Sequence, residues 1–260
     1  MPQDISGYDV GALLYCPANA HHTVAQAVAA ERLPRPFSLA LCLEDTVRAD
    51  ALAAAEQAVE QTLHDLTDAA RQETFYRPLT FVRVRSPEQL ARLGRAYGKY
   101  RPLLTGFILP KFFIETCGAY CAVIRDLQAD GLDYFYMPVF EAPSMLPLHT
   151  RHAALAEVKA QLDALRECIL NIRVGGNDLC HVFGLRRDPG HTIYDLRPVA
   201  DVLTDLLTTF APDYLVAGPV WEYYDGPGWA EGLAQECALD RLNGFVGKTV
   251  IHPKQIPIVN

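Results

Sequence analysis

The stretch RVGGNDLCHVFG, at residues 173–184, places an aspartate directly after a short apolar run. Gly175 and Gly176 follow that run, and such a pair allows backbone conformations closed to other residues and close approach to a ligand. Asn177 and Asp178 come next, so a carboxylate would stand on a rigid base where a strand ends. A metal or substrate could bind there, although Gly-Gly-Asn-Asp is also ordinary turn chemistry.

Charged residues follow four earlier apolar runs as well, at Glu44-Asp45, Arg83, Lys111 and Glu141. Each has a simple structural reading, since Arg83 could pair with Glu44 or Asp45, Glu141 could cap a helix and Lys111 could be solvated. In a barrel of parallel strands, however, these positions would surround one mouth, which is the face that carries the active site. Charge at five successive strand ends therefore favours a functional site.

The residue types at these positions suit magnesium-assisted carbon chemistry. Glu141 and Asp178 supply hard oxygen ligands, too few for a calcium cage but suitable for Mg²⁺, which keeps waters and takes substrate oxygens. Arg83 offers a planar fork for a carboxylate or for a developing enolate oxygen. Asp45 or Glu44 could transfer a proton or orient the nearby cations. The layout predicts a carbon–carbon lyase or aldolase that acts on a 2-oxo or hydroxy acid through a metal-bound enolate.

Eight short apolar runs alternate with segments of helical periodicity. The runs cover residues 12–16, 37–43, 79–84, 106–109, 134–140, 168–174, 214–217 and 247–251, and the main helices are expected at 21–30, 50–70, 117–129, 151–166, 195–210 and 229–242. This alternation predicts an α/β fold, a (β/α)₈ TIM barrel, as one domain over residues 1–260. A doubly wound open sheet is the alternative. The eighth helix is expected to be truncated or absent, so a neighbouring subunit could close the barrel.

The composition excludes several classes of partner. The net charge is −8 and the isoelectric point is about 5.5, which leaves no broad basic surface for nucleic acid. The chain from Met1 lacks a charged and then apolar leader, and no segment has eighteen consecutive apolar residues, so we expect neither secretion nor a membrane partner. The seven cysteines show no paired CxxC spacing, which is consistent with a reducing cytoplasm. A small-molecule substrate is the expected partner.

Four other motifs have weaker functional readings. His149 and His152 form an HxxH pair that could hold zinc, but no third ligand has fitting spacing. Cys180 and His181 are neighbours on an expected helix and would point apart, which argues against a thiol nucleophile. The aromatic segment at residues 221–229 could form a lid or pack over the barrel rim. The pair at residues 186–187, two arginines, could bind phosphate or form a solvated turn.

Seven short motifs, in chain order, resemble those of the HpcH/HpaI aldolase and citrate lyase β-subunit family. They are LLYCPAN (13–19), LCLEDTV (41–47), FVRV (81–84), ILPK (108–111), VFEAP (139–143), GGNDL (175–179) and GKTVIHPKQ (247–255). Together they span nearly the whole chain. The wording GALLYCPA, at residues 11–18, also resembles a divergent branch of TIM-barrel carbon–carbon lyases associated with bacterial tellurium-resistance and stress operons.

The resemblance implies a magnesium-dependent TIM barrel that makes or breaks carbon–carbon bonds, often in acyl-CoA thioesters of hydroxy acids. By resemblance, Glu141 and Asp178 are the metal ligands, and Arg83 is the substrate or enolate arginine. Glu44 and Asp45 are the acidic pair beside it, and Lys111 has a supporting place among the catalytic candidates. The expected substrate-binding residues are Arg83, Gly175, Gly176, Asn177 and His252.

Two departures from the family pattern bear on the substrate. The arginine that usually begins the family's first strand is replaced by Gly11-Ala12, and the family's C-terminal extension is absent after Asn260. Both argue against CoA thioesters. The alternatives to a citrate lyase-like enzyme are therefore a small pyruvate-type aldolase that never uses CoA and a non-catalytic barrel that binds metal or ligand. A homo-oligomer is expected.

Overall fold

Eight parallel strands form the centre of the computed structural model, which describes residues 5–45, 47–72 and 74–260. They are β1 (Ala12–Pro17), β2 (Ser38–Cys42), β3 (Thr80–Arg83), β4 (Leu104–Leu109), β5 (Phe135–Phe140), β6 (Ile172–Val174), β7 (Val216–Ala217) and β8 (Lys248–Val250). Their order in the sheet is β7-β6-β5-β4-β3-β2-β1-β8. Met1 and Thr46, which belong to two of the sequence arguments, lie outside the described residues.

The two end strands of this order meet and close the ring. Gly218, just after β7, forms a parallel bridge with Lys248 of β8. Beside it the Val246 backbone N–H donates to the Val216 carbonyl over 2.8 Å. Closure of eight parallel strands confirms the (β/α)₈ barrel and excludes the open doubly wound sheet. The ring closes through the chain's own strands.

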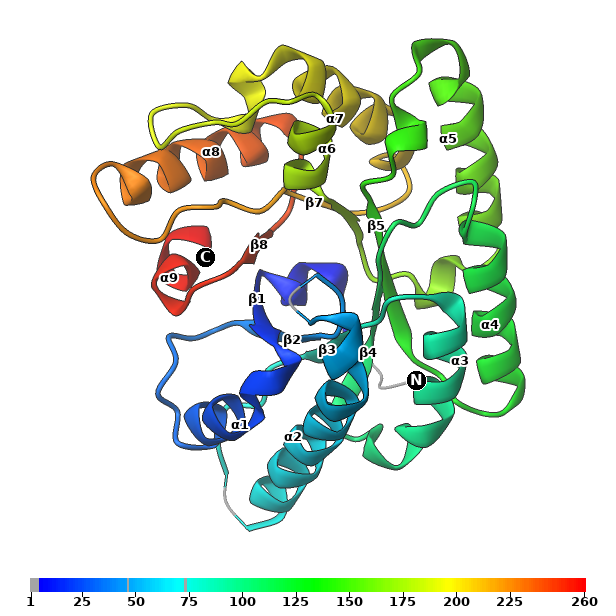
Figure 1. Cartoon of the computed structure of the whole chain (residues 1–260), viewed down its shortest axis with the longest axis vertical. Helices are drawn as coiled ribbons and strands as arrows, with labels where there is room; N and C mark the ends of the chain where they lie inside the picture. Colours follow the sequence, from blue (N-terminus) through cyan, green and yellow to red (C-terminus); the bar gives the residue numbers. More distant parts are fainter. Residues whose placement is uncertain (1–4, 46, 73) are drawn as a thin grey trace.

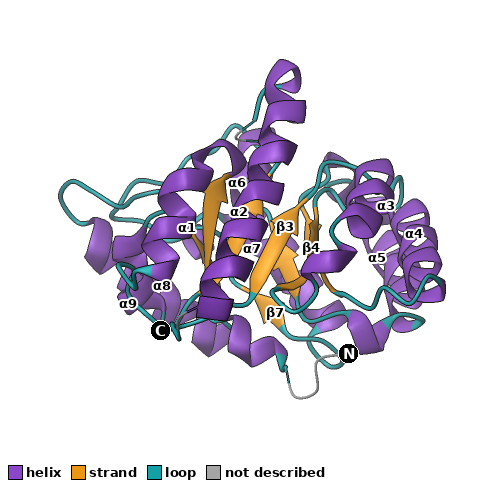
Figure 2. Ribbon diagram, turned by 90° about the horizontal axis from the view of Figure 1, so that it is seen from below, coloured by secondary structure: helices purple, strands orange, loops and turns teal. Residues whose placement is uncertain are grey.

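Helices surround the strands on the outside (Figures 1 and 2). They are α1 (His21–Ala29), α2 (Leu52–Gln72), α3 (Pro87–Ala96), α4 (Cys117–Ala129), α5 (Leu148–Asp163), α6 (Gly176–Val182), α7 (Arg197–Phe210), α8 (Trp229–Asn243) and α9 (Ile256–Val259). The last has four residues and follows β8. Within the described ranges, no helix is long and apolar enough to cross a membrane.

The start of α3 shows how local sequence sets an element boundary. Ser86 is the N-cap, and its hydroxyl accepts from the Gln89 backbone N–H over 3.3 Å. Pro87 occupies the first helical turn, where its missing N–H costs no hydrogen bond. The buried face of the helix then includes Leu90 and Leu93, which pack against the barrel.

The strands read as unbroken apolar runs because both of their faces are buried. Outward side chains pack under the helices. Inward side chains of the lower barrel form a separate cluster of Val10, Leu13, Ala40, Phe81, Ile108, Phe135, Met137, Val139 and Leu170. Val10 comes from the short 3₁₀ helix η1 (Gly7–Val10), so this cluster fills the barrel at the N-terminal ends of the strands.

Candidate active site

Polar side chains form the next inward layer above this apolar cluster. Because inward positions recur every second residue, Tyr15 follows Leu13 on β1, and Arg83 follows Phe81 on β3. Glu141 in the same way follows Val139 at the end of β5. The alternation therefore places Arg83 and Glu141 inside the barrel, at its C-terminal mouth.

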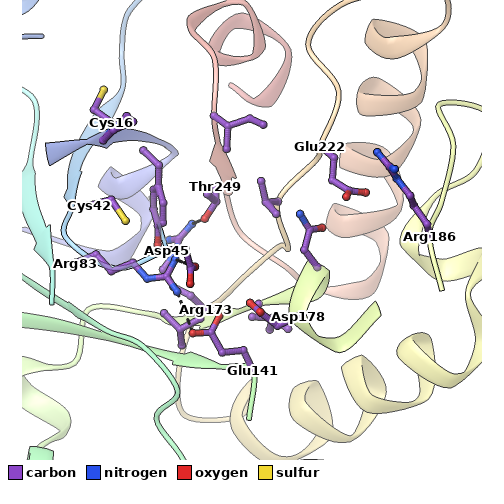
Figure 3. Close-up of a pocket in the computed structure, with 18 residues that line it drawn as sticks. Cys16, Cys42, Asp45, Arg83, Glu141, Arg173, Asp178, Arg186, Glu222 and Thr249 are labelled. Atoms are coloured by element: carbon purple, nitrogen blue, oxygen red, sulfur yellow. Dashed lines mark hydrogen bonds and ion pairs between the residues drawn. The ribbon is translucent and has the colours of Figure 1, made fainter. Parts of the chain in front are cut away.

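A cavity of about 590 Å³ opens at this mouth, and Figure 3 shows its lining. Its charged lining residues are Asp45, Arg83, Glu141, Arg173, Asp178, Arg186 and Glu222. Glu44 and Lys111 line a smaller hollow beside it, together with Asp45. The structure thus brings together the charged residues that the sequence placed at five successive strand ends.

Three carboxylates contact the two terminal nitrogens of Arg83. Its Nη2 lies 2.8 Å from Glu44 Oε2 and 3.0 Å from Glu141 Oε1, and its Nη1 lies 3.2 Å from Asp45 Oδ2. The side chain is 9% exposed. Such a guanidinium fixes the three carboxyl groups relative to one another. A further anion could bind Arg83 only in competition with these groups.

The acidic pair has its two pKa values pushed in opposite directions. Burial and a hydrogen bond with Asp45 raise the pKa of Glu44. Burial also opposes ionisation of Asp45, but the hydrogen bond with Glu44 and the charge of Arg83 together lower the pKa of Asp45. Two adjacent carboxyls with separated pKa values can hold and release one proton between them. Of the two, Asp45 lines the cavity.

The loop that carries this pair is held by Arg85, which lies two residues after Arg83. Arg85 Nη2 donates to the carbonyls of Glu44 and Val47, and Nε donates to the Leu43 carbonyl. Three backbone acceptors on one guanidinium tie the end of β2 to β3. The acidic pair and its arginine are therefore positioned from the same strand.

Lys111 contacts the site in two ways. Its backbone N–H donates to Glu141 Oε1 over 3.1 Å, from a left-handed conformation with φ of 49°. Its ammonium lies 3.1 Å from Glu44 Oε1, and this hydrogen bond raises the pKa of Lys111. The side chain is 58% exposed. Lys111 is thus a charged neighbour of the acidic pair.

Glu141 and Asp178 meet in the cavity. Burial raises the pKa of Glu141 to about 8, although the charge of Arg83 opposes this. The charges of Asp178 and Glu44, and a hydrogen bond with Asp178, add to the increase. Two carboxyls so close destabilise each other's charge, which a divalent cation between them would relieve. In the described part of the chain, no cluster of three or more His, Cys, Asp or Glu side chains could hold a metal.

The two glycines before Asp178 are required by space and not by backbone angle. Gly175 has φ of −84°, and Gly176 begins α6, so the expectation of conformations closed to other residues was wrong. A Cβ on Gly175 would lie 2.2 Å from Glu141 Oε2, and one on Gly176 would lie 2.6 Å from the Pro219 side chain. Gly175 therefore leaves the room that the Glu141 carboxylate occupies.

Other predicted substrate-binding residues divide between the cavity and its surroundings. Asn177 lines the cavity, and its buried Oδ1 has no hydrogen-bond partner. Gly176 packs behind the lining. The structure does not bring His252 to the cavity lining: it stacks on Tyr224 with ring centroids 4.6 Å apart, and its Nδ1 accepts from the Lys254 backbone N–H.

Sequence reasoning missed Arg173, which lies on β6 and lines the cavity. Its side chain is buried, and its Nη2 donates to Thr249 Oγ1 over 2.7 Å. The phenol of Tyr15 contacts Arg173, and the Tyr15 ring lies 5.7 Å from Arg83 Cζ, so Tyr15 neighbours both of these arginines. The available signal was position: Arg173 is two residues before Gly175, on the same face of an otherwise apolar strand.

A second ionic cluster lies under α8, outside the barrel. This α8 cluster consists of Arg187, Glu236, Asp240 and Lys248, each with a side chain at most 6% exposed. Glu236 receives Arg187 at 2.8 Å and Lys248 at 2.9 Å, and Lys248 also lies 2.8 Å from Asp240. The cluster ties α8 to β8 and to the segment after α6.

This cluster and its neighbours decide two of the weaker motifs. Arg187 is buried against Trp221, so it forms neither a solvated turn nor an accessible phosphate site. Arg186 is exposed and lines the cavity, so for this residue the phosphate site stays a prediction. Trp221 is fully buried and packs with Leu233 and Cys237, as expected of rim packing. His152 lies at the surface of α5 with Asp205 as its partner, at 3.2 Å.

The comparisons with known proteins agree with this architecture. Residues 4–260 match the family described as C–C bond lyases of the TIM-barrel fold. No curated protein matches the sequence. The citrate lyase β subunit of M. tuberculosis complexed with oxaloacetate and magnesium is similar at 22% identity and a TM-score of 0.66, over 98% of this chain and 97% of that one.

Two further solved structures share the fold. CitE of M. tuberculosis, in complex with magnesium, acetoacetate and coenzyme A, is 23% identical with a TM-score of 0.65, over 97% of this chain and 80% of that one. RipC from Yersinia pestis is 17% identical with a TM-score of 0.63, over 98% and 95%. The fold and the charged mouth define a TIM-barrel enzyme. The chain belongs to the carbon–carbon bond lyase family of that fold, which confirms the resemblance seen in the sequence.

Proposed function

We propose that the protein is a magnesium-dependent lyase or aldolase that acts on a 2-oxo or hydroxy acid, either free or as an acyl-CoA thioester. The observation that carries this proposal is the meeting of Glu141 and Asp178 in the cavity, close enough for Asp178 to help raise the pKa of Glu141. Within the family of carbon–carbon lyases, this pair is the natural place for a divalent cation.

The residues present fit magnesium. Two carboxylates, one just after β5 and one in the first turn of α6, give a hard oxygen donor set, and Gly175 leaves the space that the Glu141 carboxylate occupies. Two protein ligands leave coordination positions for water and substrate oxygens, as Mg²⁺ prefers. When bound there, magnesium would supply Lewis-acid polarisation of a substrate carbonyl.

The chain's own residues would then orient the substrate and move a proton. Arg83 holds Glu141, Glu44 and Asp45 in one arrangement, beside the place where negative charge develops on a substrate oxygen. Asp45 would hold or release the proton at its carboxyl, with Glu44 as the group that shares it. Asn177 Oδ1 is a buried acceptor in the cavity lining and would accept a hydrogen bond from a substrate hydroxyl.

The solved relatives support the choice of ligands. One carries magnesium with oxaloacetate, and another carries magnesium with acetoacetate and coenzyme A. We carry over the cation and the acid class to this chain as part of the proposal. We also propose a cytoplasmic homo-oligomer, a location supported by the seven free cysteines, with light scattering on the purified protein as the test of assembly.

The test combines metal titration with turnover. Calorimetry should detect Mg²⁺ binding to the wild type and its loss in Glu141→Gln and Asp178→Asn. The matched control is Asp201→Asn, which changes an exposed carboxylate on α7 and should bind as the wild type does. Cleavage is assayed on panels of free acids and of acyl-CoA thioesters.

The outcomes separate the candidate functions. Magnesium-dependent cleavage of either panel supports the proposal, and cleavage of free acids alone identifies a small pyruvate-type aldolase. Metal binding without turnover on both panels would mean a non-catalytic binding barrel. Mg²⁺ binding that survives both substitutions would overturn the assignment of the site.

A further inference from the structure

Arg173 is a buried cation for which the described part of the chain offers no acidic partner. The residue is 2% exposed, and its Nη2 and Nη1 donate to the neutral oxygens of Thr249 and Asn171, at 2.7 and 3.4 Å. Its Nε has no hydrogen-bond partner. Over the described ranges, no carboxylate forms a salt bridge with it. An isolated buried charge is costly, and buried charges in proteins are normally paired or bind a ligand.

Its surroundings supply no hidden counter-ion. Tyr15 contacts the guanidinium, but burial raises the pKa of Tyr15, which keeps the phenol neutral. Burial also lowers the pKa of Arg173, the direction expected of a cation that nothing nearby neutralises. The neutral Thr249 and Asn171 hold the guanidinium in place and leave its charge uncompensated.

The contrast with Arg83 shows which arginine is available. Both lie in the polar layer of the barrel and line the same cavity, in the group shown with Glu141 and Asp178 in Figure 3. Arg83 has three carboxylate partners and Arg173 has none among the described residues. An incoming anion therefore gains most at Arg173, where it displaces no existing ion pair.

We propose that Arg173, oriented by Thr249 and Asn171 and flanked by the Tyr15 phenol, is a second anion site that binds the distal carboxylate of the substrate. The proposal rests on the proposed function, because the other end of the substrate is the end that would bind at Glu141 and Asp178. It narrows the substrate class to short acids with a free carboxylate at each end. A neutral group at the distal end, a thioester included, would leave Arg173 unpaired.

The first experiment needs no magnesium. Acetate is titrated by calorimetry into metal-free wild type, Arg173→Met and Arg186→Gln. The last is the matched control, because Arg186 lines the same cavity but is exposed to solvent. Arg173→Met should lower acetate affinity by about 10- to 100-fold, the usual value of a hydrogen-bonded charge pair, and Arg186→Gln should change it by less than about threefold.

The second experiment uses saturating Mg²⁺ and matched probes, 2-oxoglutarate against 2-oxovalerate and oxaloacetate against 2-oxobutyrate. Wild type should prefer at least one diacid by about tenfold or more, and Arg173→Met should remove the preference while monoacid binding is unchanged. Monoacid binding reports the metal end alone. If the wild type binds neither monoacid in the presence of Mg²⁺, the proposed function is contradicted. The acetate titration, which contains no metal, still decides whether Arg173 is an anion site.

A second variant tests the anion site if Arg173→Met does not fold. If Arg173→Met does not give the wild-type circular dichroism spectrum, Arg173→Lys keeps the charge but loses the planar fork, and it should retain part of the diacid preference. A wild type that binds acetate no better than Arg173→Met, or that prefers neither diacid, overturns the anion site. The anion site is also overturned if Arg186→Gln, and not Arg173→Met, removes the preference for diacids.

Discussion

Two ionic clusters lie in the protein, and their charge balance differs. The pocket cluster, at the barrel mouth, consists of Arg83 and Lys111 with Glu44, Asp45, Glu141 and Asp178, so four carboxyls face two cations. The buried members of the α8 cluster are two of each sign, and the partly exposed Glu222 adds a longer contact of 3.7 Å to Arg187. A balanced cluster can be complete by itself. An acidic excess, held in place by arginines, is what a divalent cation requires.

Burial acts on both clusters in the same way. In the α8 cluster, although burial opposes it, Glu236 and Asp240 raise the pKa of Lys248, so its ammonium is stabilised by its neighbours. Burial also raises the pKa of Asp240 there, although Lys248 opposes this. In the pocket cluster, burial and neighbouring carboxyls raise the pKa of Glu141 to about 8, although Arg83 opposes this. Each cluster holds a buried carboxyl that is destabilised when charged. Charge balance therefore separates a structural cluster from a candidate site better than burial does.

The largest effect should come from breaking the balanced cluster. Lys248→Met leaves Asp240 buried without its cation and Glu236 with Arg187 alone, and we expect a loss of about 3–5 kcal/mol in the free energy of unfolding. Urea denaturation measures this. Lys99→Met removes an exposed pair with Glu60 and should cost less than about 1 kcal/mol. Equal losses in the two variants would show that the α8 cluster does not stabilise the fold.

A smaller effect should follow from displacing Glu141, one of the two proposed metal ligands, without removing its charge. Gly175→Ala places a Cβ where Glu141 Oε2 now lies, so the carboxylate must move. We expect Mg²⁺ affinity to fall by about 10- to 100-fold, as when the support of a metal ligand is lost. Gly118→Ala on α4 is the control, because its Cβ would meet only Gln161 Oε1 at an ordinary 3.6 Å. Unchanged affinity in Gly175→Ala would argue against Glu141 as a ligand.

The raised pKa of Glu141 predicts a pH dependence of stability. In the metal-free protein the folded state favours the protonated carboxyl, so this group's contribution is fully present below its ordinary value of 4.5. It is lost as pH rises to about 8, with a slope of at most about 1.4 kcal/mol per pH unit. Subtracting the denaturation profile of Glu141→Gln isolates the effect, and Mg²⁺ should abolish it. Identical profiles for the two proteins would contradict the shift.

The smallest effect is expected at the edge of the pocket cluster. Lys111→Gln removes an ammonium that is 58% exposed, so we expect the free energy of unfolding to change by less than about 1 kcal/mol. Cleavage by the variant should fall by less than about tenfold if Lys111 only supports Glu44. Steady-state kinetics decides this, because a loss of kcat greater than about 100-fold would make Lys111 a catalytic group.

The fold was predictable because each strand of a barrel leaves a local pattern. Buried strands are apolar without alternation, and the expected helix at residues 117–129 coincides with α4. The gathering of Glu141 and Asp178 followed from their positions at strand ends. Packing distances, in contrast, have no local signal. That Gly175 avoids Glu141, and that His252 turns to Tyr224, depends on residues far apart in the chain.

Ion pairing is a second property that the sequence could not give, and Arg173 is the example. Its position inside β6 was visible, but its lack of an acidic partner was not, because pairing depends on which side chains from other strands reach it. For Arg83 the sequence offered substrate binding or pairing with Glu44 or Asp45, and the structure adds a third carboxylate, that of Glu141.

The apolar cluster beneath the cavity has a consequence for turnover. Because Val10 and its neighbours fill the N-terminal half of the barrel, reactants enter and leave through the same opening. A cleavage reaction produces two fragments in this blind-ended chamber, and the fragment nearer the exit must depart before the deeper one. Product inhibition should therefore be strongest for the fragment retained at the bottom.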